Sequence, residues 1–385
     1  MIEAKISEKG TDRCDFTELP LRKYEFIDVL DKARIYGEYI AEIGGIDDDF
    51  GVWNIRLSDA PTIDELNFFA KKHDEIKKDY TSALAFRSLV EQHESVSIAE
   101  AINYTYGLEG VPVYPCENTE EYGKIVLDNE LLEELSELPD ELYEMISPEK
   151  AGEMMQKREG GVFISSHYAI PTSYEPQLVY TDTLPEKMED WLFKLDVTAM
   201  KDDEPDEDKR EALELPATEE RLKEVEEKLG IPLTESVWVD IHSEIDGIDD
   251  CVIGSMDSIY ELNELANTLA GLPRREFAKF KAVLDHEHSK TLSEISSISM
   301  KLDNYEFEPS VTFMADYGEK YLAEMLPPEF DRELLNGEIN ASFARSVAAK
   351  NGVCLTDYGA ITHEGGHLYS MIEAQGQTQN FTQTM

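Results

Sequence analysis

The sequence predicts a mixed α/β protein (α+β), built from tandem small α/β domains in two duplicated halves, with an elongated shape. Two observations lead to this prediction. Short amphipathic helices alternate with strand-like segments along the 385 residues, and several segments recur at one spacing. A hydrophobic content of 41%, with 15 Phe, 18 Tyr and 3 Trp, is enough for packed cores. Because disordered acidic chains are poor in aromatic residues, the chain is expected to fold.

Two short motifs recur at the same spacing. Leu19-Pro20 is repeated as Leu215-Pro216, and Glu65-Leu66-Asn67 is repeated as Glu261-Leu262-Asn263. Both repeats are 196 positions apart (215 minus 19, and 261 minus 65). One offset shared by two separated motifs indicates a duplication.

The matching segments predict the same order of elements in each half: a helix, a strand, an acidic turn, two helices, more extended and helical chain, and a closing strand. A helix begins at each Glu-Leu-Asn motif. The first-half segments are 24–35 (helix), 39–43 (strand), 45–49 (turn) and 160–170 (closing segment). The second-half segments, in the same order, are 219–231, 237–241, 247–250 and 351–361.

The domain boundaries follow from the repeat and from local composition. The run "KDDEPDEDKREALE" at 201–214 is interpreted as an acidic linker. The expected parts are an N-terminal segment 1–18, a first half 19–171 with subdomains at about 19–93 and 94–171, an acidic linker region 172–214, a second half 215–361 with subdomains at about 215–290 and 291–361, and a polar C-terminal tail 362–385.

The dominant property of the composition is negative charge. The chain has 82 Asp and Glu against 35 Lys and Arg, a net charge of −47, and both halves and the region between them share the excess. No apolar run approaches a membrane span, and the polar N-terminus has no signal-peptide core, so the bacterial host cytoplasm is the expected location. The 4 cysteines are far apart, so neither a disulfide framework nor a structural zinc site is expected.

The densest acidic run lies at 125–149, which contains no Lys or Arg. Leucines recur there every three or four residues, which predicts helices with a buried stripe of Leu127, Leu131, Leu135, Leu138 and Leu142. On a helix, the acids would place roughly one charge per 3 Å, close to the ~3.4 Å per charge along one DNA strand. The run therefore suggests a surface that imitates nucleic acid.

The candidate partner-binding carboxylates come from this run, from the acidic turns and from the linker region. They are Asp128, Glu130, Glu133, Glu134, Glu137, Asp140, Glu141 and Glu144 in the run, Asp47, Asp48, Asp49, Asp246, Asp249 and Asp250 in the turns, and Asp202, Asp203, Glu204 and Asp206 in the linker.

One motif points elsewhere. His363, Glu364 and His367 have the H-E-x-x-H spacing that binds catalytic zinc on a helix. Two glycines separate Glu364 from His367, and each costs roughly 1 kcal/mol in a helix interior. The segment is therefore interpreted as a loop and the motif as a chance match, with zinc hydrolase kept as the less favoured alternative. We expect no catalytic residue, metal or cofactor.

The opening at 19–35, the strand with its acidic turn, and the helix at Glu261-Leu262-Asn263 resemble the ArdA-type antirestriction proteins. The resemblance covers most of both halves. It implies elongated chains of small α/β domains whose surface carboxylates imitate the phosphates of bent B-form DNA and occupy the DNA site of type I restriction–modification enzymes. This chain differs from the family in its length and in being duplicated.

The expected function is therefore that of a DNA-mimic inhibitor of a DNA-binding host defence enzyme, either a restriction–modification complex or another system such as CRISPR. The partner is a protein rather than nucleic acid or membrane, and the chain is a monomer with a pseudo-repeat or a homodimer. The alternative is an acidic adaptor that binds a basic protein unrelated to DNA. The two functions differ in geometry, because mimicry requires carboxylates in two rows at the separation of a duplex.

Overall fold

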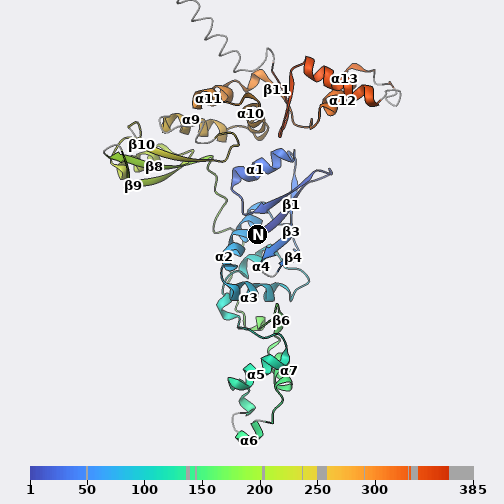
Figure 1. Cartoon of the computed structure of the whole chain (residues 1–385), viewed down its shortest axis with the longest axis vertical. Coiled ribbons are helices and arrows are strands. Elements are labelled where there is room, and N and C mark those ends of the chain that lie inside the picture. The colour runs from blue at the N-terminus through green and yellow to red at the C-terminus, as the bar shows by residue number, and fades with distance from the viewer. Residues whose placement is uncertain are drawn as a thin grey trace, which may run out of the picture. The chain divides into compact units, whose positions relative to one another are not determined.

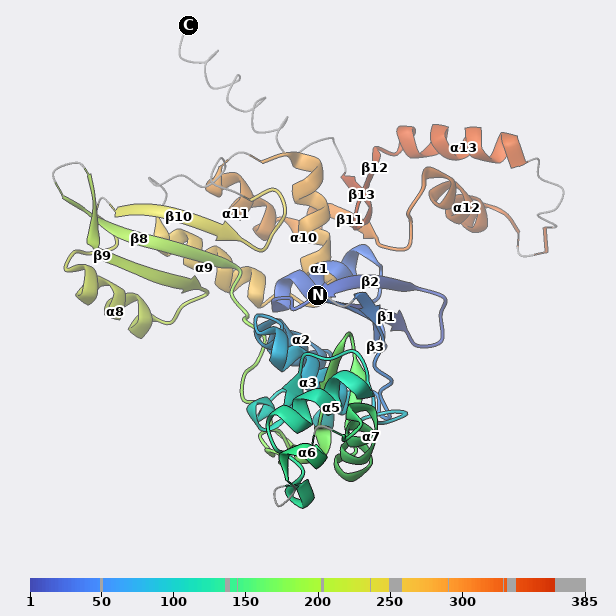
Figure 2. The same cartoon turned by 60° about the horizontal axis from the view of Figure 1, so that its bottom comes forward.

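The computed structural model confirms a mixed α/β fold with several small antiparallel sheets (Figures 1 and 2). It describes residues 1–48, 51–135, 139–143, 145–201, 204–235, 237–248, 258–289, 291–327, 329–330 and 337–363. The chain forms two compact units. Unit 1 contains Met1–Leu21 and Gly37–Met188, and unit 2 contains Arg22–Tyr36 and Glu189–Met385. Helix α1 (Lys23–Lys32) therefore belongs to unit 2, although the chain on both sides of it belongs to unit 1.

The first sheet of unit 1 has the strand order β2-β1-β3-β4, and all its strand pairs are antiparallel. Its strands are β1 (Ile2–Glu8), β2 (Cys14–Leu19), β3 (Tyr39–Asp48) and β4 (Gly51–Trp53). Ile2, Ala4 and Ile6 alternate with more exposed residues along β1, so one face of the sheet is buried. The predicted separate N-terminal segment 1–18 is wrong, because these residues form β1 and most of β2.

The remaining elements of unit 1 are helices and a second small sheet of order β5-β7-β6. Two helices begin at capping boxes that can be recognised in the sequence, Thr62 with Glu65 and Ser97 with Glu100. The elements are α2 (Ile63–Ile76), α3 (Tyr80–Val90), α4 (Ile98–Asn103), η1 (Leu108–Gly110), β5 (Val113–Tyr114), α5 (Thr119–Asp128), η2 (Glu133–Leu135), α6 (Asp140–Tyr143), α7 (Pro148–Glu159), β6 (Val162–Ile164), β7 (His167–Ala169) and η3 (Pro171–Ser173).

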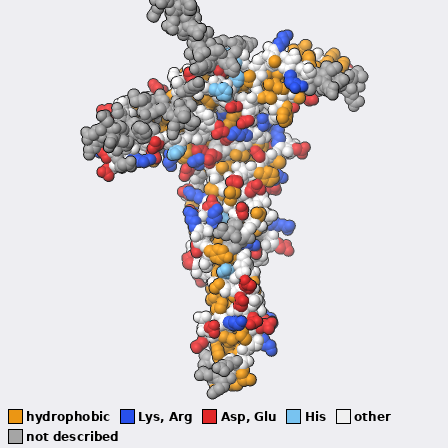
Figure 3. All heavy atoms as spheres, viewed as in Figure 1, with side chains coloured by type: hydrophobic (Ala, Val, Ile, Leu, Met, Phe, Trp, Pro, Cys, Tyr) orange, Lys and Arg blue, Asp and Glu red, His pale blue; other side chains and the backbone are white. Residues whose placement is uncertain are grey.

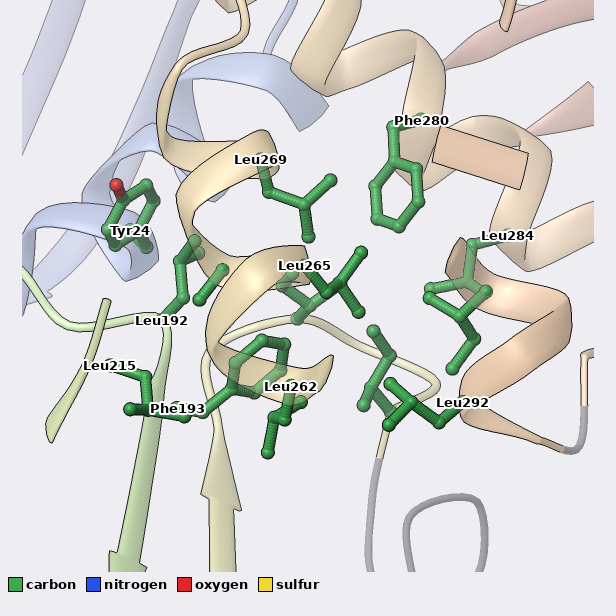
Figure 4. Close-up of a cluster of buried hydrophobic side chains, with 14 of the residues drawn as sticks. Tyr24, Leu192, Phe193, Leu215, Leu262, Leu265, Leu269, Phe280, Leu284 and Leu292 are labelled. Carbon is green, nitrogen blue, oxygen red and sulfur yellow. The ribbon is translucent and has the colours of Figure 1, made fainter. Parts of the chain in front are cut away.

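Unit 2 contains two sheets, β10-β8-β9 and β11-β13-β12, with helices around a large hydrophobic core, and a smaller cluster of Val311, Ala348, Val353 and Ala360 is separate from it. Leu262, Leu265 and Leu269 recur along α9 and point into the large core together with Phe193 and Phe280 (Figure 4). The elements after α1 are β8 (Phe193–Lys201), β9 (Glu204–Leu215), α8 (Glu219–Leu229), β10 (Val237–Ser243), α9 (Ile259–Ala270), α10 (Arg274–Glu287), α11 (Leu292–Met300), η4 (Leu302–Asn304), β11 (Tyr305–Glu308), α12 (Met314–Met325), α13 (Gly337–Lys350), β12 (Val353–Thr356) and β13 (Gly359–His363).

The same order of elements occurs twice along the chain, as the repeated motifs predict. The sheet order β2-β1-β3 corresponds to β9-β8-β10, and β5-β7-β6 corresponds to β11-β13-β12. The predicted helices at 24–35 and 219–231 are α1 and α8, the predicted strands at 39–43 and 237–241 lie in β3 and β10, and the closing strands are β6 and β12.

The repeated asparagine has the same role in both copies. Asn67 accepts a hydrogen bond from the Leu21 N–H at 2.6 Å and donates to the Leu21 carbonyl at 2.8 Å. Asn263 does the same with Ala217, at 2.8 and 3.0 Å. Each side-chain amide therefore satisfies both backbone groups of the residue that follows the repeated Leu-Pro pair. The recurring Glu-Leu-Asn motif is explained by this contact.

The predicted acidic linker is wrong for residues 204–214, which lie in the strand β9. This strand pairs with β8 along its length. Leu213 and Leu215 are completely buried, while Arg210 and Glu214 are exposed. Because side chains alternate between the two faces of a strand, a charged sequence can cover one face while a few apolar residues anchor the other. The second copy therefore begins at β8, which also lies inside the predicted linker region 172–214.

In the described part of the chain, no helix is both long and apolar enough to cross a membrane. Cys14, Cys116 and Cys354 are free thiols, and Cys14 is exposed.

Candidate acidic interaction surface

The leucine spacing predicts helices across the acidic run, and the described residues of the run before α7 form only the end of α5 and two short helical segments. Helix α5 ends at Asp128, and Glu130 has a positive φ of 54°, a conformation that interrupts a right-handed helix. A short 3₁₀ turn, η2, and the four-residue α6 follow. The estimate of one charge per 3 Å assumed a regular helix, so the described backbone does not support it.

The predicted buried leucine stripe is only partly correct. Leu127 and Leu135 are half-buried and pack against the core between α5 and α7. The residue buried between them is Leu132, at 2% exposure, while Leu131 and Leu142 are 37% and 50% exposed. The turn at Glu130 interrupts the regular helical spacing of the leucines. As a result Leu132 is buried, whereas the spacing predicts that Leu131 is. Leu138 lies outside the described residues.

Four carboxylates of the run are exposed on unit 1: Asp128, Glu130, Glu133 and Glu134. Glu134 forms an ion pair with Arg158 of α7, and this hydrogen bond holds its pKa below the usual range. Asp140 and Glu141 lie in α6, whereas Glu137 and Glu144 fall outside the described residues.

The acidic turns are divided between the two units. In unit 1, Asp47 is exposed near the end of β3, and Asp48 is the last residue of that strand, so the predicted turn begins later than expected. In unit 2, Asp246 is 74% exposed and forms an ion pair with Lys32 at 2.7 Å. Asp49, Asp249 and Asp250 lie outside the described residues.

Two of the four linker carboxylates, Glu204 and Asp206, belong to a strand. Glu204 begins β9, and Asp206 lies two residues further along it, half-buried. Asp202 and Asp203 fall outside the described residues. The candidate carboxylates are therefore held by two separate units instead of gathering on one element.

Unit 2 contains a buried charged cluster that the sequence patterns do not predict. Lys281 of α10 lies 2.7 Å from Asp28 and 3.0 Å from Asp31 of α1, and Arg274 lies 3.2 Å from Asp31. The side chains of Asp31 and Lys281 are 0% and 2% exposed. The Tyr358 hydroxyl donates to Asp28 at 2.9 Å. These acids compensate buried cations, so they do not contribute to a surface.

The two carboxylates of this cluster respond differently to burial. Burial raises the pKa of Asp31, and the nearby Lys281 and Arg274 only partly oppose that effect. Burial also acts to raise the pKa of Asp28, but Lys281 and further hydrogen bonds outweigh it and lower the pKa overall. One sequence signal does exist: Asp31 lies seven residues after the buried Tyr24, on the same face of α1.

The H-E-x-x-H match does not have the helical backbone that a zinc site of this type requires, at least at its first residue. His363 ends strand β13, and its ring lies 4.6 Å from that of Tyr305. Glu364 and His367 lie outside the described residues. Among the described residues, no group of His, Cys, Asp and Glu side chains is arranged to hold a metal ion.

Asp and Glu side chains are scattered over the face seen in Figure 3, with Lys and Arg side chains among them. Many of these cations are already paired, such as Lys124 with Glu120 and Lys228 with Glu211. If each of the 35 basic residues neutralised one of the 82 acidic residues, 47 carboxylates would remain uncompensated. The chain therefore carries a large negative net charge although many of its carboxylates are paired.

Comparison of the sequence with models of known protein families gives no match, and comparison with curated proteins gives none either.

Proposed function

We propose that the protein is a DNA-mimic inhibitor that occupies the DNA-binding groove of a bacterial defence enzyme, with a type I restriction–modification complex as the first candidate. The observation that carries the proposal is the excess of 47 acidic residues on a chain that folds into packed α/β units. A protein surface that served only to keep the chain soluble would need a much smaller net charge. The excess carboxylates also repel one another.

The mechanism is competition for a positively charged groove. DNA-binding grooves gain most of their affinity from contacts with phosphates, so a negative protein surface can satisfy the same Lys and Arg side chains. A net charge of −47 also attracts such a groove over a distance, which raises the association rate at low salt.

The folded scaffold has a further advantage over an acidic tail. Asp128 and Glu130 are positioned by the end of α5, and Asp47 by strand β3. A carboxylate already held by a rigid element loses less conformational entropy on binding than one on a flexible chain. Exposed acids on helices and strands therefore bind more tightly than the same number of acids in a disordered segment.

The test is a competition experiment. A purified type I enzyme is bound to a labelled duplex that contains its recognition site, and the protein is titrated in at two salt concentrations. We expect displacement of the duplex, with an affinity that falls steeply as salt rises, because the enzyme's phosphate contacts are salt-dependent.

Two results would count against the proposal. Inhibition without displacement of DNA would indicate a different mode of action. Binding to a basic protein that has no DNA site, with no competition by duplex DNA, would favour the acidic adaptor instead.

A further inference from the structure

A second site in unit 2 has one cation paired with two carboxylates, and a third carboxylate is hydrogen-bonded to the aromatic ring that covers the cation. Arg22, the N-cap residue of α1, lies 2.5 Å from Glu25 and 2.9 Å from Glu244, which follows β10. The third carboxylate, Glu189, accepts a hydrogen bond from the Trp191 indole at 3.1 Å. The Trp191 ring lies 4.6 Å from the Arg22 guanidinium and covers it.

Glu244 is the buried member of this group. Its side chain is 2% exposed, against 35% for Glu25. One of its oxygens, Oε2, has no hydrogen-bond donor among the described residues. Its backbone N–H donates to the carbonyl of Leu192, a core residue shown in Figure 4, so the residue is fixed in the core of unit 2.

The other two carboxylates have their own partners. Glu25 accepts from the backbone N–H of Arg22 at 2.7 Å, which caps the first turn of α1, and Glu189 is bonded to Trp191. The remaining charges on the neighbouring elements occur as pairs, Lys23 with Asp190 and Lys194 with Glu214. The single Arg22 therefore cannot neutralise all the carboxylates around it, and the most buried of them has the most to gain from a proton.

We propose that Glu244 is a proton-binding site whose ionisation lowers the stability of unit 2. At low pH the neutral carboxyl removes the repulsion with Glu25 and Glu189, and Arg22 keeps its ion pair with Glu25. As the pH rises, Glu244 ionises in a buried position where its Oε2 has no hydrogen-bond donor among the described residues, and unit 2 becomes less stable.

The electrostatic environment agrees with the geometry. Burial and the charges of Glu25 and Glu189, only partly opposed by Arg22, raise the pKa of Glu244 to about 7. A carboxyl with a pKa raised on folding stabilises the folded state below its unfolded pKa, and this contribution is lost as the pH rises through the folded value. The change is therefore expected between about pH 4.5 and about pH 7, which makes the site sensitive near neutrality.

The test uses Glu244→Gln, which imitates the protonated form, with Glu227→Gln on the exposed face of α8 as a matched control. Thermal unfolding is measured for the full chain at about pH 5.5 and about pH 8.5. We expect Glu244→Gln to unfold at a higher temperature than the wild type at the higher pH, with the difference shrinking at the lower pH. The control should follow the wild type at both. A Glu244→Gln variant that is equally or less stable than the wild type at the higher pH would overturn the proposal.

A second measurement does not depend on the variant folding. In the wild-type chain with ¹³C-labelled glutamate carboxyls, one resonance should titrate near neutral pH, well above the range of the exposed glutamates. It should be missing from the spectrum of Glu244→Gln. If no glutamate carboxyl titrates near neutrality, Glu244 is not a proton-binding site.

Discussion

At the scale of single residues, acidic side chains in this protein have two opposite roles. Asp31 and Glu244 are buried, and each depends on a cation brought by another segment of unit 2. Asp128 and Glu130 are exposed and contribute to the net charge. The amino-acid composition does not distinguish the buried acidic side chains from the exposed ones. In the sequence, Asp31 can be distinguished because it takes the place of an apolar residue on the buried face of α1, seven residues after Tyr24. Glu244 follows a strand and has no such signal.

Replacing Lys281 with Met tests the buried cluster. The change leaves Asp28 and Asp31 without the cation that lies within 3.0 Å of both. Removing one partner of a buried ion pair typically costs about 3–5 kcal/mol, because a buried charge is left uncompensated. We expect a loss of this size in the free energy of unfolding of unit 2, measured by chemical denaturation. Lys223→Met on the exposed face of α8 is the control, and a loss no larger than that of the control would show that the cluster does not stabilise the unit.

At the scale of elements, the sequence predicts helices best where the spacing of apolar residues and the capping residues indicate the same segment. Helices α1, α2, α8 and α9 all lie where periodicity and the repeated motifs place them. The sequence does not predict strand β9, because the residues on its charged face dominate the local composition. The leucine spacing after α5 gives the wrong buried residues, because the positive φ at Glu130 interrupts the helix. Both errors arise from tertiary or backbone effects that a local pattern does not contain.

The pair Tyr122-Gly123 recurs in the second half as Tyr317-Gly318, and the glycine of this repeat has an explanation at this scale. A Cβ added to Gly123 of α5 would lie 1.7 Å from the Pro148 carbonyl oxygen at the start of α7, and one added to Gly318 of α12 would lie 2.0 Å from the Cβ of Ala344 in α13. Each glycine therefore allows close approach of two helices, and this packing occurs once in each copy.

Substituting Gly123 with Ala should consequently force α5 and α7 apart. Overpacking typically costs about 1–3 kcal/mol, so the thermal stability of unit 1 should fall and proteolysis within 119–159 should become faster. Gly110→Ala is the control, because a Cβ there meets no atom within 4 Å. Equal stability of the two variants would mean that the helices adjust without strain.

At the scale of the whole molecule, charge and duplication make separate predictions. A compact chain of 385 residues would have a radius of gyration of about 21 Å. The sequence predicts an elongated chain of small domains, so small-angle scattering at moderate salt should give a clearly larger value. A radius near the compact value would contradict the predicted shape, while leaving the charge argument intact.

The last prediction concerns how the negative surface works. If inhibition depends on a summed field, no single exposed carboxylate is indispensable, because an exposed ion pair contributes only about 0–1 kcal/mol. Asp128→Asn, Glu130→Gln or Glu133→Gln alone should weaken inhibition less than about fivefold, whereas the three together should weaken it roughly tenfold or more. These changes keep side-chain shape, so the fold should be unaffected.

The matched control removes positive charge from the same helices. Lys124, Lys150 and Lys157 are exposed on α5 and α7, and replacing all three with Gln makes the surface more negative. A field mechanism predicts that this variant inhibits at least as well as the wild type, and that added salt reduces the differences among all the variants because exposed charges are screened beyond about 8 Å at physiological ionic strength. The measurement is displacement of a labelled duplex from the target enzyme at two salt concentrations. Complete loss of inhibition from one neutral substitution, with the fold retained, would instead indicate a specific pocket contact, since one charge among 82 cannot dominate a sum.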